Sequence, residues 1–511
     1  MKNKKNLIYL ISLAFFSISL GNDLLPLYGK SFFVPRSQGA HSNYEALGFN
    51  QYINHTQSGL RGGVVIAPQY YQAFKTRRLA EYFFGTNTLS ISGSTVANRQ
   101  DNALLADYFG LPTDYNSCVH LDPFVHNAVL DTAFYISWRS WYLYVHIPYA
   151  WSKTGITITE EQISTVNPDY PQYYMAQAPI QPPAKTFKQA ISGGYTWGDI
   201  TQGLSYSKIA CHGLKDNGIA DVDIAIGWNF LHRERGTVGC NLRITAPTGT
   251  HSTAEYLLEP IIGNGRHWQL GVGLNAQGLI WEKDGDQTLD IVSHINVTHL
   301  FASEQIRSFD LNNRFGSRYI LAKEFNAQQQ YTGNTQPLAN ITTLPCKTRN
   351  AAQVDATIMF DYQYNTYRCA FGYNGWGKTA EGIELTECFS NNTWGLKGIA
   401  NVANALGAVP DTQSNATLHG NNLADQATVI DTNPPVLISN NSLDLRSGAA
   451  SRQFTHTLFA HGEYRWITKH IHPAIGFGCS FEFEGARPHN ISANKNNMSQ
   501  WGIWIITSIS M

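Results

Sequence analysis

Charged side chains recur at alternate positions within several short segments of the chain, each between strongly apolar neighbours. Asp223 lies between two aliphatic residues, and so does Arg243. Alternate side chains of a β-strand point to opposite faces of its sheet, so the charges share one face and the apolar residues share the other. The residues predicted on the polar face are Asp221, Asp223, Arg243, Asp290, His294, Asp355, Asp361, Arg368, His461, Glu463, Arg465, Glu482 and Glu484.

Acidic and basic groups that face each other across a narrow aqueous space create a transverse field, which sorts solutes by charge. The same groups can instead neutralise one another in a filled interior, as they do in small barrels. We favour the first arrangement and predict that these residues line a pore. The glycines on the same face leave space that water, an inward-folded loop or residues 22–58 would occupy.

Three common catalytic and cofactor-binding motifs are absent from this chain. Neither the nucleophile elbow GxSxG, the dinucleotide loop GxGxxG nor the zinc motif HExxH occurs. The histidines at 294, 299, 456, 461, 470 and 472 lack ligand spacing, and we interpret them as solvated or interfacial groups. We therefore expect a protein that is not an enzyme and has no catalytic residue, metal or cofactor.

The elements that must position the charges are antiparallel strands, because the alternation continues through paired segments joined by turn residues. Five hairpins are predicted: 134–138 with 141–149, 222–231 with 238–246, 268–277 with 289–298, 354–363 with 367–373, and 458–466 with 475–483. A strand near 60–72 precedes them, and a final strand from Trp501 to Met511 follows, with Trp504 and Ile506 as exceptions to its alternation. The total is about 12 strands, with both chain ends on one side, and the long links leave a range of 12–16.

Three features favour a membrane barrel over a soluble sheet. The apolar face is oily along nearly every strand, aromatic residues gather at strand ends, and short turns alternate with long links. We therefore predict an all-β protein: a closed antiparallel transmembrane β-barrel with short periplasmic turns and long external loops. The alternative is a soluble β-sandwich, in which Ile224, Leu242, Leu270 and Ile358 would lie together in a buried core.

The last strand resembles the C-terminal segment of Gram-negative outer-membrane barrel proteins. Ile503, Ile505, Ile509 and Met511 occupy alternate apolar positions, whereas Thr507 and the terminal methionine depart from a pattern that usually ends in phenylalanine. The resemblance implies recognition by the barrel-assembly machinery.

A second, shorter resemblance lies in the segment 243–249, which reads RITAPTG, followed by GNG at 263–265. This strand–loop–strand arrangement is similar to barrels of the fatty-acid and aromatic-compound transporter type. The resemblance implies a loop between two strands and transfers no residue roles.

The N-terminus has the features of a secretory signal peptide. Three lysines precede the apolar run from Leu7 to Leu20, and Ser19 and Gly21 are the small residues of a cleavage site. The alternative of a membrane anchor needs about 20 apolar residues, and this run has about 14. We assign residues 1–21 to the signal peptide, 22–58 to an extended segment in the periplasm or the lumen, and 59–511 to the barrel.

Composition adds limits on partners and on disulfides. The formal charge of −1, from 36 basic and 37 acidic groups, gives no basic surface for nucleic acid. Cys240, Cys369 and Cys479 lie on apolar strand faces. The other four cysteines (118, 211, 346 and 388) lie in predicted links, where two disulfides would form in an oxidising compartment.

We expect a porin-like outer-membrane channel for the passive diffusion of small solutes. The alternatives are a transporter for hydrophobic compounds and a structural or surface-recognition barrel whose external loops, such as 379–452, bind a partner. The expected partners are outer-membrane lipids, the barrel-assembly machinery and small solutes, without nucleic acid. Homo-oligomerisation remains open.

Overall fold

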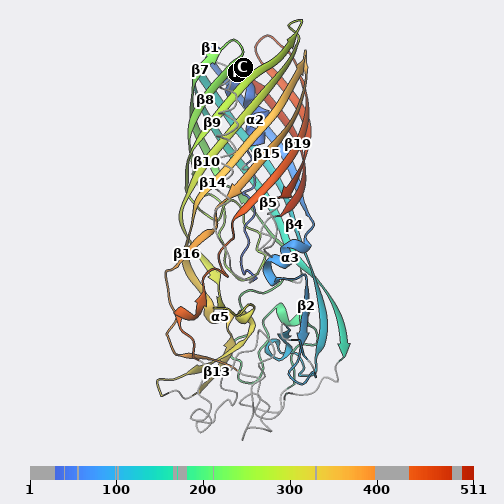
Figure 1. The fold of residues 1–511 in the computed structure, drawn as a ribbon, viewed down its shortest axis with the longest axis vertical. Coiled ribbons are helices and arrows are strands. Elements are labelled where there is room, and N and C mark those ends of the chain that lie inside the picture. The colour runs from blue at the N-terminus through green and yellow to red at the C-terminus, as the bar shows by residue number, and fades with distance from the viewer. Residues whose placement is uncertain are drawn as a thin grey trace, which may run out of the picture.

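Twelve long strands form a closed antiparallel barrel, as the computed structural model shows (Figure 1). The structure describes residues 29–39, 41–53, 57–97, 99–100, 103–164, 170, 181–210, 212–328, 331–397, 437–485 and 498–511. The barrel strands are β1 (Gln57–Phe74), β4 (Asn116–Arg139), β5 (Trp141–Ser164), β7 (Val222–Arg233), β8 (Gly236–Ala246), β9 (Gln269–Lys283), β10 (Gln287–Ser308), β14 (Thr343–Tyr364), β15 (Tyr367–Lys378), β19 (Gln453–Arg465), β20 (His472–Glu484) and β21 (Ser499–Ser510). Each pairs with its neighbour in sequence, and β1 pairs with both β4 and β21, which closes the sheet. The predicted strand number is confirmed.

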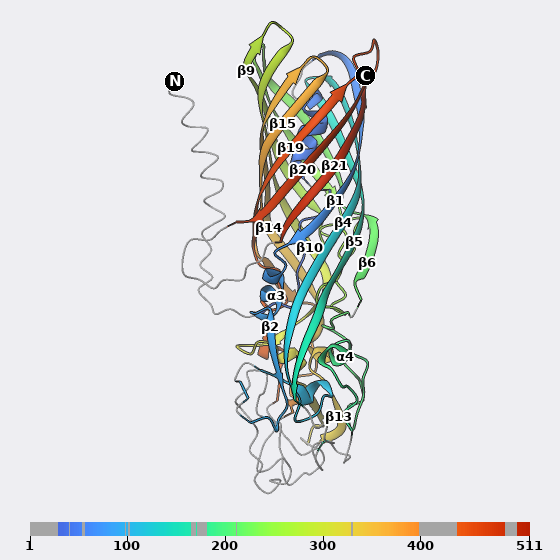
Figure 2. The same ribbon diagram turned by 90° about the vertical axis from the view of Figure 1, so that its right-hand side faces the viewer.

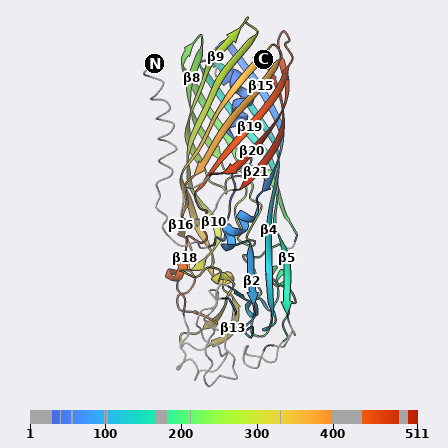
Figure 3. The same ribbon diagram turned by 45° about the vertical axis from the view of Figure 1, so that its right-hand side comes forward.

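The two ends of the barrel differ because short turns lie at one end and long links at the other. The turns after β4, β7, β9, β14 and β19 form the short-turn end, which is uppermost in Figure 1. Neighbouring strands such as β15, β19, β20 and β21 lie side by side and strongly tilted (Figure 3). Strands β4 and β5 have 24 residues each and extend well beyond the barrel at the long-loop end (Figure 2). These strands exceed the predicted ranges because their extensions beyond the membrane lack the oily face on which the prediction depends.

The apolar face of the sheet points outward. Ile224, Leu242, Leu270 and Ile358 are 41%, 52%, 43% and 40% exposed, so they do not share a buried core. The soluble sandwich is therefore wrong. A closed sheet satisfies every strand's backbone without an open edge, so it can present this apolar surface to hydrocarbon.

Aromatic side chains surround the barrel at two levels. Trp141 and Trp228 stack near the short turns, with their ring centroids 6.0 Å apart. Trp268 and Phe483 lie exposed at the opposite ends of their strands. Amphipathic aromatic rings favour the boundaries between hydrocarbon and water, so the two levels mark the faces of a membrane.

The long links fold into an assembly with its own hydrophobic core, which we call the cap (Figure 1). Its elements, including the short strands that extend the barrel sheet, are α3 (Arg77–Phe84), β2 (Thr88–Ser92), β3 (Leu104–Leu105), η1 (Ala106–Phe109), α4 (Phe187–Ile191), β6 (Leu214–Ile219), β11 (Asp310–Leu311), η2 (Ser317–Tyr319), β12 (Leu321–Phe325), β13 (Tyr331–Pro337), α5 (Ala339–Thr342), β16 (Glu381–Leu385), β17 (Trp394–Leu396), η4 (Asn440–Ser442) and β18 (Leu443–Asp444). Of the predicted external loop 379–452, residues 398–436 lie outside the described part of the chain.

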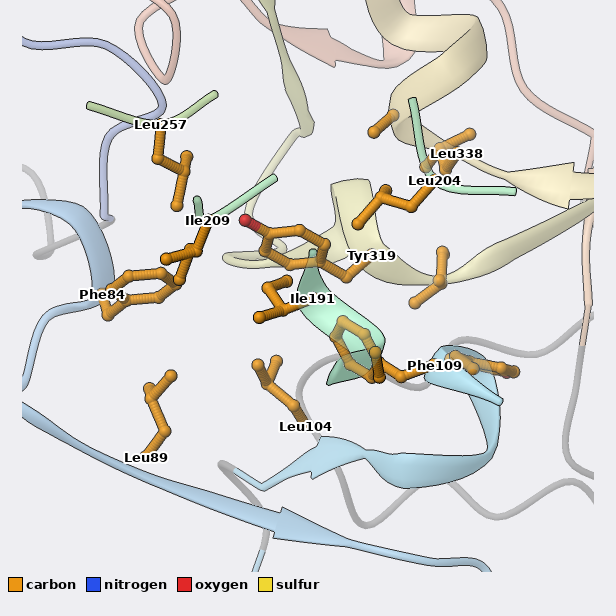
Figure 4. Close-up of a cluster of buried hydrophobic side chains, with 14 of the residues drawn as sticks. Phe84, Leu89, Leu104, Phe109, Ile191, Leu204, Ile209, Leu257, Tyr319 and Leu338 are labelled. Carbon is orange, nitrogen blue, oxygen red and sulfur yellow. The ribbon is translucent and has the colours of Figure 1, made fainter. Parts of the chain in front are cut away.

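The cap core joins links that are far apart in the sequence. Phe109 packs edge-on against Phe187 with ring centroids 5.2 Å apart, and it lies tilted against Tyr319 with centroids 5.5 Å apart. Ile191 and Leu338 lie in the same cluster (Figure 4). Burial of these side chains stabilises the links against each other, since long segments without packing of their own are uncommon in compact proteins.

Helix α2 (Ser42–Ile53) lies inside the barrel (Figure 2). No helix in the described ranges has the length and apolar character needed to cross a membrane. Of the four cysteines predicted to pair, Cys118, Cys346 and Cys388 are free thiols, and Cys211 lies outside the described residues, as does the predicted signal peptide 1–21.

Inward-facing glycines make room for large side chains that cross the lumen. A Cβ atom added at Gly478 would overlap the Trp504 ring, and one added at Gly227 would overlap the ring of Tyr142. The space that these glycines leave is therefore occupied by neighbouring aromatic rings. At Gly462, on the lipid-facing side, an added Cβ atom would meet no described atom within 4 Å.

We predict that Gly478→Val destabilises the barrel by about 1–3 kcal/mol, because the new side chain overpacks against Trp504. The matched control is Gly462→Val, which adds the same atoms where nothing described obstructs them. Urea unfolding of the detergent-refolded protein, followed by heat-modifiable gel migration, measures both. Equal stability of the two variants would contradict the packing described here.

We predict that Phe187→Ala removes about 3–5 kcal/mol from cap packing, the usual cost of truncating a buried phenylalanine. Limited proteolysis should then cleave the cap faster while the barrel strands resist. Lys185→Ala, an exposed change two residues away, serves as the control. An unchanged cleavage rate in the Phe187 variant would show that the cap does not depend on this core.

Candidate functional site in the barrel lumen

Residues 29–39 and 41–53, here called the lumen segment, run through the barrel from one end to the other. At the long-loop end, the backbone N–H of Lys30 donates to the carbonyl of Tyr82 (3.0 Å). Near the short-turn end, the Leu47 carbonyl accepts from Arg368 Nη1 (2.6 Å). Strand β1 begins and β21 ends at the short-turn end, as an even number of strands requires, whereas Lys30 lies at the long-loop end. Residues 42–53 are helical where an extended segment was expected.

Asp355 holds the beginning of α2. Its Oδ2 accepts from the backbone N–H of Ser42 (3.1 Å), and its Oδ1 accepts from the Ser42 hydroxyl (2.7 Å). Arg36 forms an ion pair with the same carboxylate. A negative group is favoured at a helix N-terminus because the unpaired N–H groups and the helix dipole point at it. One wall residue thus binds both halves of the lumen segment.

Arg243 of β8 joins the helix to a second part of the barrel wall. Its Nη2 donates to Glu45 Oε2 and its Nη1 donates to Asp223 Oδ2, both at 2.6 Å. Thr245 donates to the other oxygen of Asp223 at 3.0 Å. The guanidinium therefore pairs with one carboxylate of the wall and one of the lumen segment, as its planar fork allows.

A second charged cluster surrounds Arg368 near the short-turn end. Its Nε donates to Asp361 Oδ1 and its Nη2 to Asp361 Oδ2, both at 2.8 Å, in a bidentate pair. Glu463 lies 3.6 Å from Arg368 Nη1 and accepts from Arg465 at 2.7 Å. His461 lies 3.6 Å from the same Glu463 carboxylate. These five predicted residues are brought together.

The other predicted residues lie outside these ion-paired clusters, although Asp290 borders the second one. Asp290 faces Asp361 across the β10–β14 pair, and His294 is buried with its Nε2 lacking a described hydrogen-bond partner. Glu482 accepts from Gln500 (2.6 Å). Glu484, at the rim, pairs with Arg78 of α3. All thirteen residues are placed by the barrel strands or, for Asp221, by the position just before β7, and their role in lining a conduction path stays a prediction.

An apolar contact accompanies the polar ones. Tyr44 of α2 packs edge-on against Trp504 with ring centroids 5.1 Å apart, and its hydroxyl bonds to that of Tyr71. Trp504 and Ile506, the two exceptions to the alternation of the last strand, are each 1% exposed and face inward. They break the pattern because they contact the lumen segment rather than lipid or water.

Sequence reasoning missed several lumen residues. Arg36, His41 and Glu45 precede the first strand, where no alternation assigns them to a face. His146 and Asp131 form a buried pair between β5 and β4. The alternation that placed residues 145 and 147 outside also turns His146 inward, so this residue had a usable signal.

A polar cavity of about 60 Å³ remains beside the lumen segment. Its lining includes the carboxylates of Glu45, Asp221, Asp223 and Asp355, the guanidinium of Arg243 and the imidazoles of His41 and His146. A void of this size and polarity accommodates a few water molecules. The lumen is thus largely filled, and its residual space has an acidic lining.

The run from Gly372 to Thr379 has the GxxxxGKT spacing of a phosphate-binding loop. It begins within β15 and ends just after it, with the short strand β16 following. A phosphate loop needs a turn between a strand and a helix, whose backbone N–H groups converge on the ligand. The paired backbone of β15 cannot supply them, so the match has no functional meaning here.

No protein-family model and no curated protein matches the chain. Among solved structures, it is similar to the Pseudomonas putida toluene transporter TodX (7% identity, 95% of this chain and 98% of that chain covered, TM-score 0.31). It is also similar to the transport unit of the autotransporter AIDA-I from Escherichia coli (7%, 94% and 99%, 0.29) and to a Pseudomonas aeruginosa FadL homologue (8%, 88% and 89%, 0.25). Likenesses this weak carry no argument about function, and the fold stands on the strand pairing described above.

We predict that Asp355→Ala loosens α2, because the change removes the acceptor of Ser42 and the partner of Arg36. Hydrogen bonds to charged groups contribute about 1.5–3 kcal/mol, so amides of residues 42–53 should exchange with deuterium roughly 10- to 100-fold faster. Asp122→Ala, on the exposed face of β4, is the matched control. Unchanged exchange in the Asp355 variant would mean that this carboxylate does not anchor the helix.

Proposed function

We propose that the protein is an outer-membrane channel for small polar solutes that its own lumen segment keeps closed at rest. The observation that carries the proposal is the pairing between that segment and the barrel wall. Arg36 binds Asp355, and Glu45 binds Arg243. The closed sheet encloses the space that a passage requires, and the segment occupies it.

The size of the barrel supports a passage once the segment moves. Eight strands enclose a space that side chains fill, whereas 16 to 18 strands leave an aqueous channel. Twelve strands lie between these cases, and here the interior holds a 12-residue helix in addition to wall side chains. Displacement of that helix would leave room for water and small solutes.

The contacts between the lumen segment and the barrel wall favour a segment that can leave the lumen over one that fills it permanently. Hydrogen bonds and ion pairs join Arg36, Ser42 and Glu45 to the wall, and water can replace such contacts at modest net cost. Tyr44, Ala46 and Leu47 are buried in a hydrophobic cluster with wall residues, and this packing opposes release. The apolar contact of Tyr44 with Trp504 opposes release. Because these contributions oppose each other, the closed and open states can differ in free energy by only about a few kcal/mol. A gating element requires a difference of this size.

The difference between the two ends of the barrel leads to the orientation that we propose for it in the outer membrane. The short turns would face the periplasm and the cap would face the exterior, with lipid against the apolar belt. Export by the predicted signal peptide and insertion by the barrel-assembly machinery belong to the same proposal. A passage for hydrophobic compounds fits less well, because charged groups dominate the described lumen.

A second candidate is a surface-recognition barrel, and the folded cap favours it. Ordered, projecting loops over a filled lumen are the features that this alternative requires. The cap is firmly packed, with side chains such as Phe109, Phe187 and Tyr319 buried in its core. A barrel that serves only recognition would remain without conductance when the lumen segment is released.

Planar-bilayer recording tests the proposal. We expect rare openings from the purified protein, and at least tenfold higher open probability from the double variant Arg36→Gln/Glu45→Gln, which keeps the segment but removes two of its ion pairs. A deletion of residues 29–53 should give a constantly open channel. The control is Lys185→Ala in the cap. A heat-modifiable, folded deletion variant without conductance would reject the channel.

A further inference from the structure

We infer that the passage prefers cations and that Asp221 is a residue that determines this preference. The inference rests on the proposed function, since it names the class of solute that the channel would admit. Two features support it: the acidic cavity beside the lumen segment, and the one carboxylate there that forms no ion pair with any described residue.

The charges around the cavity are unequal. Four carboxylates line it, those of Glu45, Asp221, Asp223 and Asp355, against the single guanidinium of Arg243. In an enclosed space of low dielectric constant, such an imbalance acts over several ångströms with little screening. A cation gains and an anion loses electrostatic energy on entering.

Three of the four carboxylates have a cationic partner within an ion-pair distance. Arg243 lies 2.6 Å from both Asp223 and Glu45, and Arg36 pairs with Asp355. These three carboxylates carry three negative charges against the two positive charges of Arg243 and Arg36, so the pairs leave one negative charge in excess. The fourth group, which has no cationic partner within ion-pair distance, adds a second.

Asp221 is that group. Its Oδ2 accepts from the Ser37 hydroxyl at 2.7 Å, and the backbone N–H of Asn264 lies beside it. Its Oδ1 has no hydrogen-bond partner among the described residues, although the side chain is only 5% exposed and lines the cavity. Lys378 acts on it through space, but no ion pair between them occurs in the described part of the chain. Burial raises the pKa of the Asp221 carboxyl group to about 7. A cation beside its unpartnered oxygen would stabilise the charged form.

The surrounding loop is built to approach this carboxylate closely. Gly263 has φ = +81°, and a Cβ atom there would lie 2.8 Å from Asp221 Oδ1. Only glycine suits both the backbone conformation and the contact. The loop backbone therefore packs directly against Asp221, beside the cavity that this carboxylate lines.

Release of the lumen segment preserves the imbalance. Arg36 and Glu45 leave together, which removes one positive and one negative charge. The cavity wall then carries Asp221, Asp223 and Asp355 against Arg243. Within the described residues, no group of three or more His, Cys, Asp or Glu side chains is arranged to hold a metal ion. The solute class that fits is a small hydrated monovalent cation or an organic ammonium ion in transit.

Reversal potentials in a tenfold KCl gradient across a planar bilayer test the inference, with the full-length protein and the Arg36→Gln/Glu45→Gln variant. We expect K⁺ to permeate several-fold better than Cl⁻. Asp221→Asn should lower this ratio at least twofold, and Asp221→Glu should retain it. The matched control is Asp122→Asn, on the exposed face of β4, which should leave the ratio unchanged.

Two results would overturn the inference while leaving the channel intact: a preference for Cl⁻, or an unchanged ratio in Asp221→Asn. Absence of conductance from every folded variant would reject the proposed function and the inference together. Heat-modifiable migration of each variant confirms that a folded barrel is being measured. Tetramethylammonium in place of K⁺ then tests whether organic ammonium ions pass as well.

Discussion

Charged groups that the strands turn into the lumen are stabilised by ionic partners, because an enclosed interior solvates charge poorly. The Asp361 side chain has no solvent exposure, and its carboxylate accepts hydrogen bonds from Nε and Nη2 of Arg368. Asp355 forms an ion pair with Arg36 and accepts a hydrogen bond from the backbone N–H of Ser42 at the beginning of α2. The position of the lumen segment follows from this requirement, since the segment supplies the partners that the wall lacks.

Much of the barrel could be predicted from the sequence because lipid imposes a simple rule on it. Every lipid-facing side chain must be apolar and every strand must be paired, so alternation such as that around Ile224 and Leu242 reveals the strands and their faces directly. The cap could not be predicted in this way. Phe109, Phe187 and Tyr319 come from three separate links, and their contacts follow no period within any one link.

The candidate site was partly predictable for the same reason. Alternation placed Asp223, Arg243 and Asp361 on the inner face, but it carried no information on which charges would meet. Their partners Arg36 and Glu45 belong to a segment without strand periodicity. Trp504 was visible as an exception in the last strand, and its meaning became clear only from its contact with Tyr44.

The path of the lumen segment also constrains how the molecule is assembled. The backbone of Lys30 is hydrogen-bonded at the long-loop end, and the chain then crosses the whole interior. Strand β1 starts at the opposite end and pairs with β21, the last barrel strand in the sequence. A segment that crosses a finished cylinder and continues into its wall would have to be threaded through it. Assembly is simpler if the sheet closes around the lumen segment. In that order of events, β1 and β21 pair last, and the lumen segment already lies inside the sheet when they do.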